Sequence, residues 1–386
     1  MKINKSIAIH HHALIYKSES YYYINSFIGA WINEICKYYK SVSYIAHCSQ
    51  KKSIEQDFKI KSSDINFISL GPELRFRNFN KKKIIIDHLL KANDIKYDLL
   101  LVRGITPYQN LVIRNFKAKK MFYLLVGNLR GGDNSFNFKM SFLLQIIFYF
   151  LRIYKMRIFS DKVEFLVNSP GLIKEIKQVT TKKPKFVPTN TLKNDDFNSY
   201  LNYDIIFSEK ISLIFVGRVV EDKGIYELIK AFIHLNKSKK NKYFLNIIGS
   251  CTKKMKRKIL DLIPKQIESR IKFHGFIKFG PNLFELYKQN NFFILPSYHE
   301  GFPHTIWEAA SQKISVITTK VGGIPDLVNE NEVTFIKKKN VKSLIEKILY
   351  LQNNPRITNK KIEALYNKSL KYSLENCVKI LSNTVN

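Results

Sequence analysis

The stretch that decides the fold is Phe292-Phe-Ile-Leu-Pro-Ser-Tyr-His-Glu300-Gly-Phe-Pro-His-Thr-Ile-Trp-Glu308. It begins with a short apolar run, Phe292–Leu295, which predicts a buried strand. A loop with glycine and proline follows, and Pro303 suits the first turn of a helix because its missing N–H is not needed there. A strand, a tight loop and a helix start form the crevice in which parallel α/β sheets hold phosphorylated ligands.

The start of this helix predicts an anion site at the positive end of the helix dipole. The amides expected to point outward are those of Phe302, His304, Thr305 and Ile306. Glu300 in the loop and Glu308 in the helix would accept hydrogen bonds from vicinal hydroxyls. The alternative is a surface glutamate followed by a glutamate on a solvated helix face, and the loop context favours a ligand site.

A second segment, about 80 residues upstream, predicts a clamp for a diphosphate. Ser212–Gly217 is a short apolar run ending in glycine, which predicts a buried strand. Arg218 and Lys223 follow it, and the next helix has apolar residues at Ile225, Leu228, Ile229, Phe232 and Leu235. An arginine fork and a lysine charge at one strand end suit a diphosphate. Two solvated cations in a lysine-rich chain are the alternative.

Together these segments resemble the retaining nucleotide-sugar glycosyltransferases of the GT-B fold, specifically family 4. The matching residues occur in order over about residues 211–330: Gly217-Arg218, Lys223-Gly224, Pro296-Ser297, Glu300-Gly301-Phe302-Pro303, Glu308-Ala309 and Gly322-Gly323-Ile324-Pro325-Asp326. The resemblance implies an α/β protein with two Rossmann-like, doubly wound parallel-sheet domains that face each other across a cleft.

The resemblance also implies functions for individual residues. Glu308 would hold the ribose hydroxyls, Glu300 would contact the transferred sugar, and Arg218 and Lys223 would bind the diphosphate. Further donor contacts are expected from Gly217, Gly301, Phe302, Pro303, Thr305, Gly249 and Phe276. No cofactor or metal is expected, because cations and helix amides would neutralise the leaving diphosphate.

Strand and helix patterns alternate along the chain, which predicts doubly wound parallel sheets. The expected strands are Ser6–Ile9, Val42–Ala46, Asn66–Ser69, Leu99–Val102, Met121–Val126, Val163–Asn168, Ser212–Val216, Tyr243–Ile248, Ile271–His274, Phe292–Leu295 and Ser315–Thr318. The polar stretch Thr180–Asp204 is the expected linker. We expect an acceptor-binding domain at 1–190, a nucleotide-sugar-binding domain at 191–356, and a helical tail at 357–386 that the resemblance returns to the first domain.

The acceptor side is less defined by motif. In His10-His11-His12, consecutive side chains point to different sides, so they make a poor metal cage, but His12 is a candidate for acceptor binding. Many family relatives have a glycine-rich loop here and a histidine after a central strand, and this chain has neither. Asn128, Arg130 and Arg103 are candidates to contact acceptor sugar or phosphate, but not to act as a general base.

The net charge of +33 is spread over the chain, with 32 basic and 13 acidic residues before residue 191. Two explanations of this charge are equally good. One is composition bias, and the other is attraction to anionic membranes and lipid-diphosphate acceptors. The amphipathic stretch Met140–Phe159 is either a core helix or a membrane-interface helix. Four scattered cysteines, no signal-peptide pattern and no long apolar run lead us to expect a cytoplasmic protein, with peripheral contact at the inner membrane face.

The expected activity is sugar transfer with retention from a UDP- or GDP-sugar to a lipid-linked or glycan acceptor in bacterial surface polysaccharide synthesis. A nucleotide-sugar epimerase of the same fold is one alternative, and it would consume donor without acceptor. A basic nucleic-acid-binding protein is the other. It would need aromatic residues interleaved with cations on one surface, whereas the aromatic residues here lie mostly in apolar runs, so no nucleic-acid partner is expected.

Overall fold

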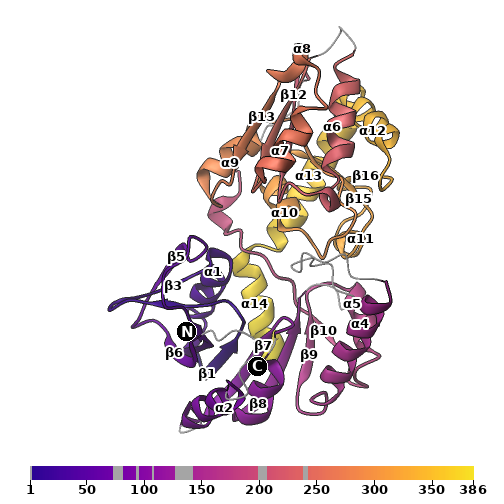
Figure 1. Ribbon diagram of the computed structural model, residues 1–386. Helices are drawn as coiled ribbons and strands as arrows, with labels where there is room; N and C mark the ends of the chain where they lie inside the picture. Colours follow the sequence, from indigo (N-terminus) through magenta and orange to yellow (C-terminus); the bar gives the residue numbers. More distant parts are fainter. Residues whose placement is uncertain are drawn as a thin grey trace. The chain divides into compact units, whose positions relative to one another are not determined.

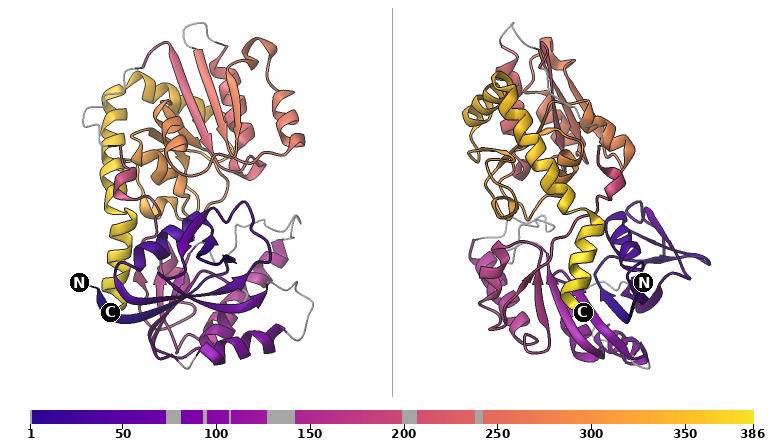
Figure 2. Two further views of the ribbon diagram at one scale, coloured as in Figure 1. Left: turned by 90° about the vertical axis from the view of Figure 1, so that its left-hand side faces the viewer. Right: turned by 180° about the vertical axis from the view of Figure 1, so that it is seen from behind.

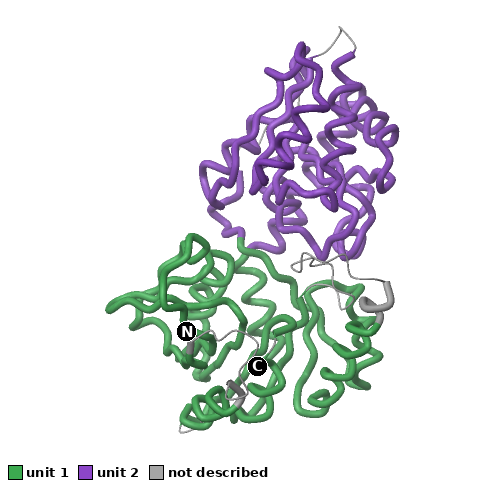
Figure 3. Tube along the Cα trace, in the orientation of Figure 1, with its two compact units in different colours: residues 1–191, 374–386 green, residues 192–373 purple. Residues whose placement is uncertain are grey.

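The computed structural model describes residues 2–72, 81–92, 95–106, 108–126, 142–198, 207–237 and 242–386. The chain forms two compact units (Figure 3). The first contains Met1–Thr191 together with Leu374–Asn386, and the second contains Leu192–Ser373. The change from one unit to the other falls inside the stretch Thr180–Asp204.

The first unit is built on a seven-stranded sheet with the order β10-β9-β8-β7-β1-β4-β6 (Figure 1). Its pairings are all parallel. The strands are β1 (Ile3–His10), β4 (Tyr39–Cys48), β6 (Asn66–Pro72), β7 (Tyr97–Arg103), β8 (Ala118–Leu125), β9 (Glu164–Val167) and β10 (Lys185–Phe186). The chain runs outward from β1 to β6 and then returns to β7, so the strand order reverses between β1 and β7.

Apolar side chains cover both faces of this sheet. In β1, Ile7 and Ile9 belong to one core and Ala8 to the other, as the two-residue period of a strand requires. The first core includes residues of α1 (Ser26–Ile35) and α14 (Leu374–Val385), and Figure 2 shows α14 against the strands. The second includes residues of α2 (Lys81–Ala92), α3 (Gln109–Asn115), α4 (Phe142–Arg157) and α5 (Gly171–Ile176). The near-continuous apolar strands follow from burial on both faces.

Four short strands of the first unit were not expected from the sequence. The strands β2 (Tyr16–Lys17), β3 (Tyr21–Ile24) and β5 (Phe58–Lys61) form a small antiparallel sheet. The fourth, β10, lies in the stretch expected to be only a linker. It pairs with β9 through Lys185–Leu166 and Phe186–Val167. The first part of that stretch is therefore sheet edge rather than linker.

The second unit has a six-stranded parallel sheet with the order β13-β12-β11-β14-β15-β16. Its strands are β11 (Lys210–Val216), β12 (Lys242–Ile248), β13 (Ile271–Gly275), β14 (Phe292–Leu295), β15 (Ser315–Thr319) and β16 (Thr334–Ile336), of which β16 was not expected. The chain builds β11 to β13 outward and then returns beside β11 with β14. This is the doubly wound order in which ligands bind where the direction reverses, here between β11 and β14.

Helices surround this second sheet. They are α6 (Ile225–Leu235), α7 (Lys253–Leu260), α8 (Lys265–Glu268), α9 (Pro281–Lys288), α10 (His304–Ser311), α11 (Ile324–Leu327), α12 (Val341–Asn353) and α13 (Pro355–Lys371). The five apolar positions expected to form one face of α6 are all buried. The periodicity of the sequence thus predicted both the helix and its buried face.

The C-terminal stretch is helical, but it is shared between the two units. α13 belongs to the second unit, where Tyr366 meets Phe197 at 5.8 Å between ring centroids. α14 belongs to the first unit, and its apolar residues Leu374, Val378, Leu381 and Val385 lie in the core beside α1. Only the last helix therefore returns to the first unit, not the whole of 357–386.

Among the described residues, none of the helices combines the length and apolar character that crossing a bilayer requires.

Candidate functional site

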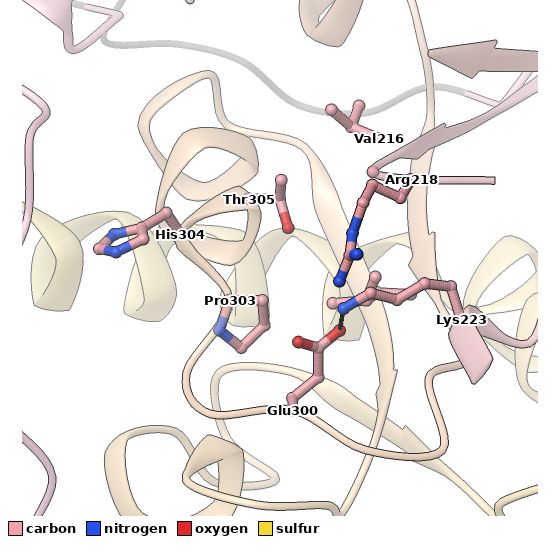
Figure 4. A pocket seen from close by; sticks show the side chains of 9 residues that line it. Val216, Arg218, Lys223, Glu300, Pro303, His304 and Thr305 are labelled. Atoms are coloured by element: carbon pink, nitrogen blue, oxygen red, sulfur yellow. Dashed lines mark hydrogen bonds and ion pairs between the residues drawn. The ribbon is translucent and has the colours of Figure 1, made fainter. Parts of the chain in front are cut away.

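A pocket of about 210 Å³ lies in the second unit where the strand order reverses. It is lined by Val216, Gly217, Arg218, Lys223, Leu295, Glu300, Pro303, His304 and Thr305 (Figure 4). Val216 and Leu295 are the last residues of β11 and β14, so the pocket occupies the carboxyl ends of two neighbouring parallel strands. Two sequence segments about 80 residues apart meet here.

Two hydrogen bonds hold the Glu300 side chain in the pocket. Its Oε1 accepts hydrogen bonds from Lys223 Nζ at 2.5 Å and from Ser297 Oγ at 2.7 Å. Ser297 is fully buried, and its carbonyl oxygen accepts from Thr319 Oγ1 at 2.6 Å. The Glu300 side chain is 8% exposed and that of Lys223 is 19% exposed. The ion pair is therefore partly shielded from water and joins the loop after β14 to η2 (Glu221–Lys223).

Arg218 follows β11 and is exposed. Its guanidinium points toward the Lys223–Glu300 pair in Figure 4. The pocket lining thus contains two cations and one carboxylate, so it retains a net positive charge. Such a site can accept a dianionic group between a planar fork and a lysine point charge.

The helix start differs in one detail from the sequence expectation. α10 begins at His304, and Pro303 precedes it in extended conformation instead of occupying the first helical turn. The N–H of Ile306 donates to the Pro303 carbonyl at 3.1 Å, so it does not point outward as expected. Thr305 lines the pocket, and a first-turn N–H such as this one has no acceptor within an α-helix.

Glu308 lies one turn into α10 but is not among the lining residues of the pocket. It is 9% exposed, and its Oε2 accepts from the Tyr287 hydroxyl of α9 at 3.0 Å. Burial raises the pKa of the Glu308 carboxyl to about 7, and the hydrogen bond from Tyr287 acts in the opposite direction. Glu308 therefore changes charge near neutral pH.

The other expected donor contacts lie outside the pocket lining, namely Gly301, Phe302, Gly249 and Phe276. The Gly301 carbonyl accepts from Gly323 N–H at 2.7 Å, and the Phe302 ring packs on Trp307. Phe276 is 71% exposed. A Cβ atom at Gly249, where φ is +134°, would lie 1.9 Å from the Gly217 carbonyl oxygen. Gly249 is thus required for close packing of the loops after β11 and β12.

The acceptor-side candidates belong to the first unit. Arg103 ends β7, and His12 follows β1 and is exposed. Asn128 and Arg130 lie outside the described residues. Within the part of the chain that is described, no cluster of His, Cys, Asp and Glu side chains could hold a metal ion.

Three site residues were not assigned a function from the sequence. Ser297 was noted only as part of a motif, His304 only for its amide, and Tyr287 not at all. A serine three residues before Glu300, just after the expected strand, is a local signal that could have been used. Tyr287 reaches Glu308 from another helix, and no sequence pattern connects them.

Residues 204–369 match the family of glycosyl transferases group 1. The capsular polysaccharide biosynthesis glycosyltransferase CapM of Staphylococcus aureus is 30% identical over 210 residues, which cover 49% of this chain and 53% of that protein.

The N,N'-diacetylbacillosaminyl-diphospho-undecaprenol alpha-1,3-N-acetylgalactosaminyltransferase of Campylobacter jejuni is 25% identical over 269 residues, 68% of this chain and 63% of that protein. The crystal structure of Anabaena Alr3699/HepE in complex with UDP-glucose superposes with a TM-score of 0.69 and 13% identity, covering 99% of each chain.

The chain spans about half the length of the Staphylococcus relative. The family match lies within the second unit, whereas the structural match extends over both units. The solved structures that it resembles include glycosyltransferases with the GT-B architecture. The expected fold is confirmed. The chain has the GT-B fold, and its residues 204–369 match the glycosyl transferases group 1 family.

Proposed function

We propose that this protein is a retaining glycosyltransferase of family 4 that uses a nucleotide-diphosphate sugar. The observation that carries the proposal is the pocket at the β11/β14 reversal, where Arg218 and Lys223 lie beside Glu300. It combines positive charge for a diphosphate with a fixed carboxylate for sugar hydroxyls. Neither feature alone is specific, but their meeting at a strand-order reversal suits a nucleotide sugar.

In the proposed complex, Arg218 and Lys223 bind the diphosphate, with Lys223 dividing its hydrogen bonds between phosphate and Glu300. Glu300 accepts from hydroxyls of the sugar, and Ser297 keeps its carboxylate in place. Glu308 accepts from the ribose hydroxyls. It must be ionised to accept at both oxygens, which links donor affinity to its pKa of about 7.

The reaction breaks the bond between the anomeric carbon and the diphosphate oxygen, and both electrons leave with the diphosphate. Arg218 and Lys223 stabilise this developing charge, which is their contribution to rate. The acceptor hydroxyl bonds to the anomeric carbon on the face that the diphosphate leaves, and its proton passes to a phosphate oxygen. Because the cations act directly on the leaving group, we expect transfer without added metal.

The donor is a UDP- or GDP-sugar and the acceptor a lipid-linked or glycan intermediate of a bacterial surface polysaccharide. Support comes from the relatives, one crystallised with UDP-glucose and one named for a diphospho-undecaprenol acceptor. The Staphylococcus relative is named for capsular polysaccharide biosynthesis.

Contact with an anionic membrane is part of the proposal. α4 buries Ile153 and Met156 in the first unit, so the expectation of a core helix is correct for that face. Its other face exposes Ile147, Phe148, Phe150, Leu151, Tyr154 and the following Ile158 at 40 to 64%. No acidic residue occurs in 142–160, and Lys155 and Arg157 are exposed. Apolar side chains flanked by cations suit an anionic lipid surface.

Thermal denaturation with UDP, GDP, ADP and their sugars, first without metal and then with Mg²⁺, tests the donor site. A ligand at 100 times its dissociation constant stabilises the folded protein by about 2.7 kcal/mol. One clear hit, followed by sugar transfer that needs an acceptor, supports the proposal. Donor consumption without acceptor would instead indicate an epimerase, and salt-dependent nucleic-acid binding with no nucleotide effect would indicate a nucleic-acid-binding protein.

Sedimentation with phosphatidylcholine vesicles, with and without phosphatidylglycerol, tests the membrane contact. Replacing Phe150 and Tyr154 of α4 by glutamate should weaken binding to anionic vesicles by at least about tenfold, because two apolar side chains no longer insert. The matched control replaces Leu349 and Tyr350, which are exposed on α12, by glutamate. Equal losses in both variants would contradict a specific membrane contact through α4.

A further inference from the structure

The first unit has its own reversal of strand order, between β1 and β7, and a buried arginine lies there. Arg103 is the last residue of β7, and the preceding Val102 pairs with His10, the last residue of β1. The carboxyl ends of these parallel strands therefore meet at one edge of the sheet. This is the position in a doubly wound sheet at which ligands bind.

Arg103 is buried, but part of its guanidinium lacks hydrogen-bond partners in the described structure. Its side chain is 2% exposed, and its guanidinium carbon lies 4.8 Å from the ring centroid of Phe27 and 4.9 Å from that of Trp31. These two rings of α1 fix the plane of the guanidinium. Nε and one terminal nitrogen make no hydrogen bond in the described structure. Buried charges in proteins are normally paired and hydrogen-bonded.

Among the described residues, no carboxylate acts on the Arg103 guanidinium. Burial lowers the pKa of its guanidinium to about 10, and only the nearby Tyr44 hydroxyl opposes this. His11 is half-buried, and its pKa lies well below the usual value through burial and the charge of Arg103. Burial likewise lowers the pKa of His10 to about 4. The guanidinium thus lies against two aromatic rings and near the His11 imidazole.

Other arginines of the chain show what Arg103 lacks. Arg157 Nε donates to the carbonyl oxygen of Gln178 at 2.9 Å. Arg270 Nη1 donates to Asn236 Oδ1 at 2.6 Å. Both of these are more exposed than Arg103, so they need their partners less. An arginine kept only to fill the core would be expected to have such partners too.

We propose that Arg103 binds an anionic group, a phosphate or carboxylate, of the ligand that the first unit holds at its β1/β7 edge. The free Nε and terminal N–H groups match the two oxygens of such a group. In the proposed complex, half-buried His11 moves aside to admit the anion. Under the proposed function this ligand is the acceptor, so the inference deepens that function and names the acceptor as acidic.

Trp31 gives a local signal for this binding. The chain has two tryptophans, Trp31 and Trp307, so Trp307→Phe leaves only the one that touches Arg103. We expect the fluorescence of Trp31 in this background to respond saturably to inorganic pyrophosphate. Arg103→Met should weaken the response at least about tenfold, and Arg103→Lys less, because lysine retains the charge but not the fork. Arg114→Met, an exposed arginine of α3, is the matched control and should behave as the parent.

Stability separates a binding function from a structural one. If Arg103 serves to bind an anion, the substitution Arg103→Met removes an unpaired buried charge from the free protein. The variant should then melt no lower than the parent in the absence of ligand. A lower melting temperature with unchanged pyrophosphate binding would overturn the proposal. Failure of both the Met and the Lys variants to fold would also overturn it, because the guanidinium would then be needed for the fold.

Two further probes identify the source of the anion. Geranyl diphosphate represents a lipid diphosphate, and methyl glucuronide represents an acidic sugar. Binding of either one, lost in Arg103→Met, supports the proposal and selects the acceptor class. No Trp31 response to any of the three probes, in protein that still binds a donor nucleotide, would overturn this inference alone. If instead the protein bound no nucleotide while Trp31 still responded to a probe, the result would contradict the proposed donor site and not this inference.

Discussion

The two sheets reverse their strand order at β1/β7 and at β11/β14, and they treat positive charge in opposite ways at these places. In the second unit, Lys223 is paired with Glu300 in an open pocket. In the first unit, Arg103 is buried against aromatic rings, and no residue of the described ranges forms an ion pair with it. The same topology thus offers one site whose lysine already has a carboxylate partner before a ligand arrives and one whose arginine has none among the described residues.

The largest effect should follow from removing the paired lysine. Lys223→Ala takes away one of the two cations that face the leaving diphosphate, so transfer should fall by about 10²- to 10³-fold. Initial rates of transfer with a nucleotide sugar measure it. Lys230→Ala, an exposed lysine on α6, is the control and should retain its rate.

The melting temperature of each variant checks that the fold persists. Wild-type-like turnover in folded Lys223→Ala would remove Lys223 from the site and would weaken the contrast between the two reversals.

The pocket of the second unit was more accessible to sequence reasoning than the β1/β7 edge of the first unit, for physical reasons. Arg218, Lys223 and Glu300 lie in loops directly after apolar strands, and such loops lie at one sheet edge wherever the strands are parallel. Pro303 was expected inside the first turn, but it directly precedes the helix. A proline suits both the residue before a helix and its first residue, so the sequence did not separate the two positions. The partners of Glu300 and Glu308, Ser297 and Tyr287, follow from packing between elements.

In the first unit, the expected strands indicated the sheet, but β10 is only two residues long and lies between Pro184 and Pro188. Such a strand forms because the neighbouring β9 offers its edge, and the local sequence does not require it. Arg103 was recognised only as a charge at a strand end. Its burial depends on Phe27 and Trp31 from α1, more than 70 residues earlier, and no local pattern reveals that contact.

A second prediction concerns the pH dependence of the second unit. The pKa of Glu308 is raised from 4.5 to about 7 by burial. The folded state then holds its proton more tightly than the unfolded state, so this contribution to stability is complete below pH 4.5 and is lost as the pH rises to about 7. The change should be about 3 kcal/mol.

Urea denaturation of wild type and Glu308→Gln across this pH range isolates the contribution, because glutamine does not titrate. Over the same range, the affinity of wild type for the donor nucleotide should rise as Glu308 ionises. A constant stability difference between the two proteins from pH 4.5 to 7.5 would show that Glu308 titrates normally, and its burial would then need another explanation.

The first unit should respond to pH with the opposite sign. His10 donates from Nδ1 to the carbonyl of Ile45 at 2.9 Å, which leaves Nε2 to accept from the Thr106 hydroxyl at 3.1 Å. Burial lowers the pKa of His10 from 6.5 to about 4. Its contribution to stability is therefore complete above pH 6.5 and is lost as the pH falls to about 4, by up to about 3 kcal/mol.

His10→Asn should remove this dependence, and urea denaturation between pH 4 and 7 measures the difference from wild type. Glu308→Gln serves as the paired control, since its difference from wild type must change in the other direction. A His10→Asn variant that loses stability equally at every pH would show that His10 matters only for packing.

The smallest effect on stability should come from a substitution in the loop that follows Arg103. Gly104 has φ +78°, and its N–H donates to the Leu124 carbonyl at 2.8 Å. A Cβ atom there would meet only His11, at 4.0 Å, so the space is open. Gly104→Ala should therefore cost only the left-handed conformation, about 1 kcal/mol, since fewer unfolded conformations offset part of the strain. Urea denaturation measures this loss of stability. The Gly104→Asn variant should lose less, because asparagine tolerates positive φ better.

A loss above about 3 kcal/mol in Gly104→Ala would mean that the edge beside Arg103 is closely packed. An anion could then not approach the guanidinium through the loop, and the difference between the two reversals would be one of packing instead of charge.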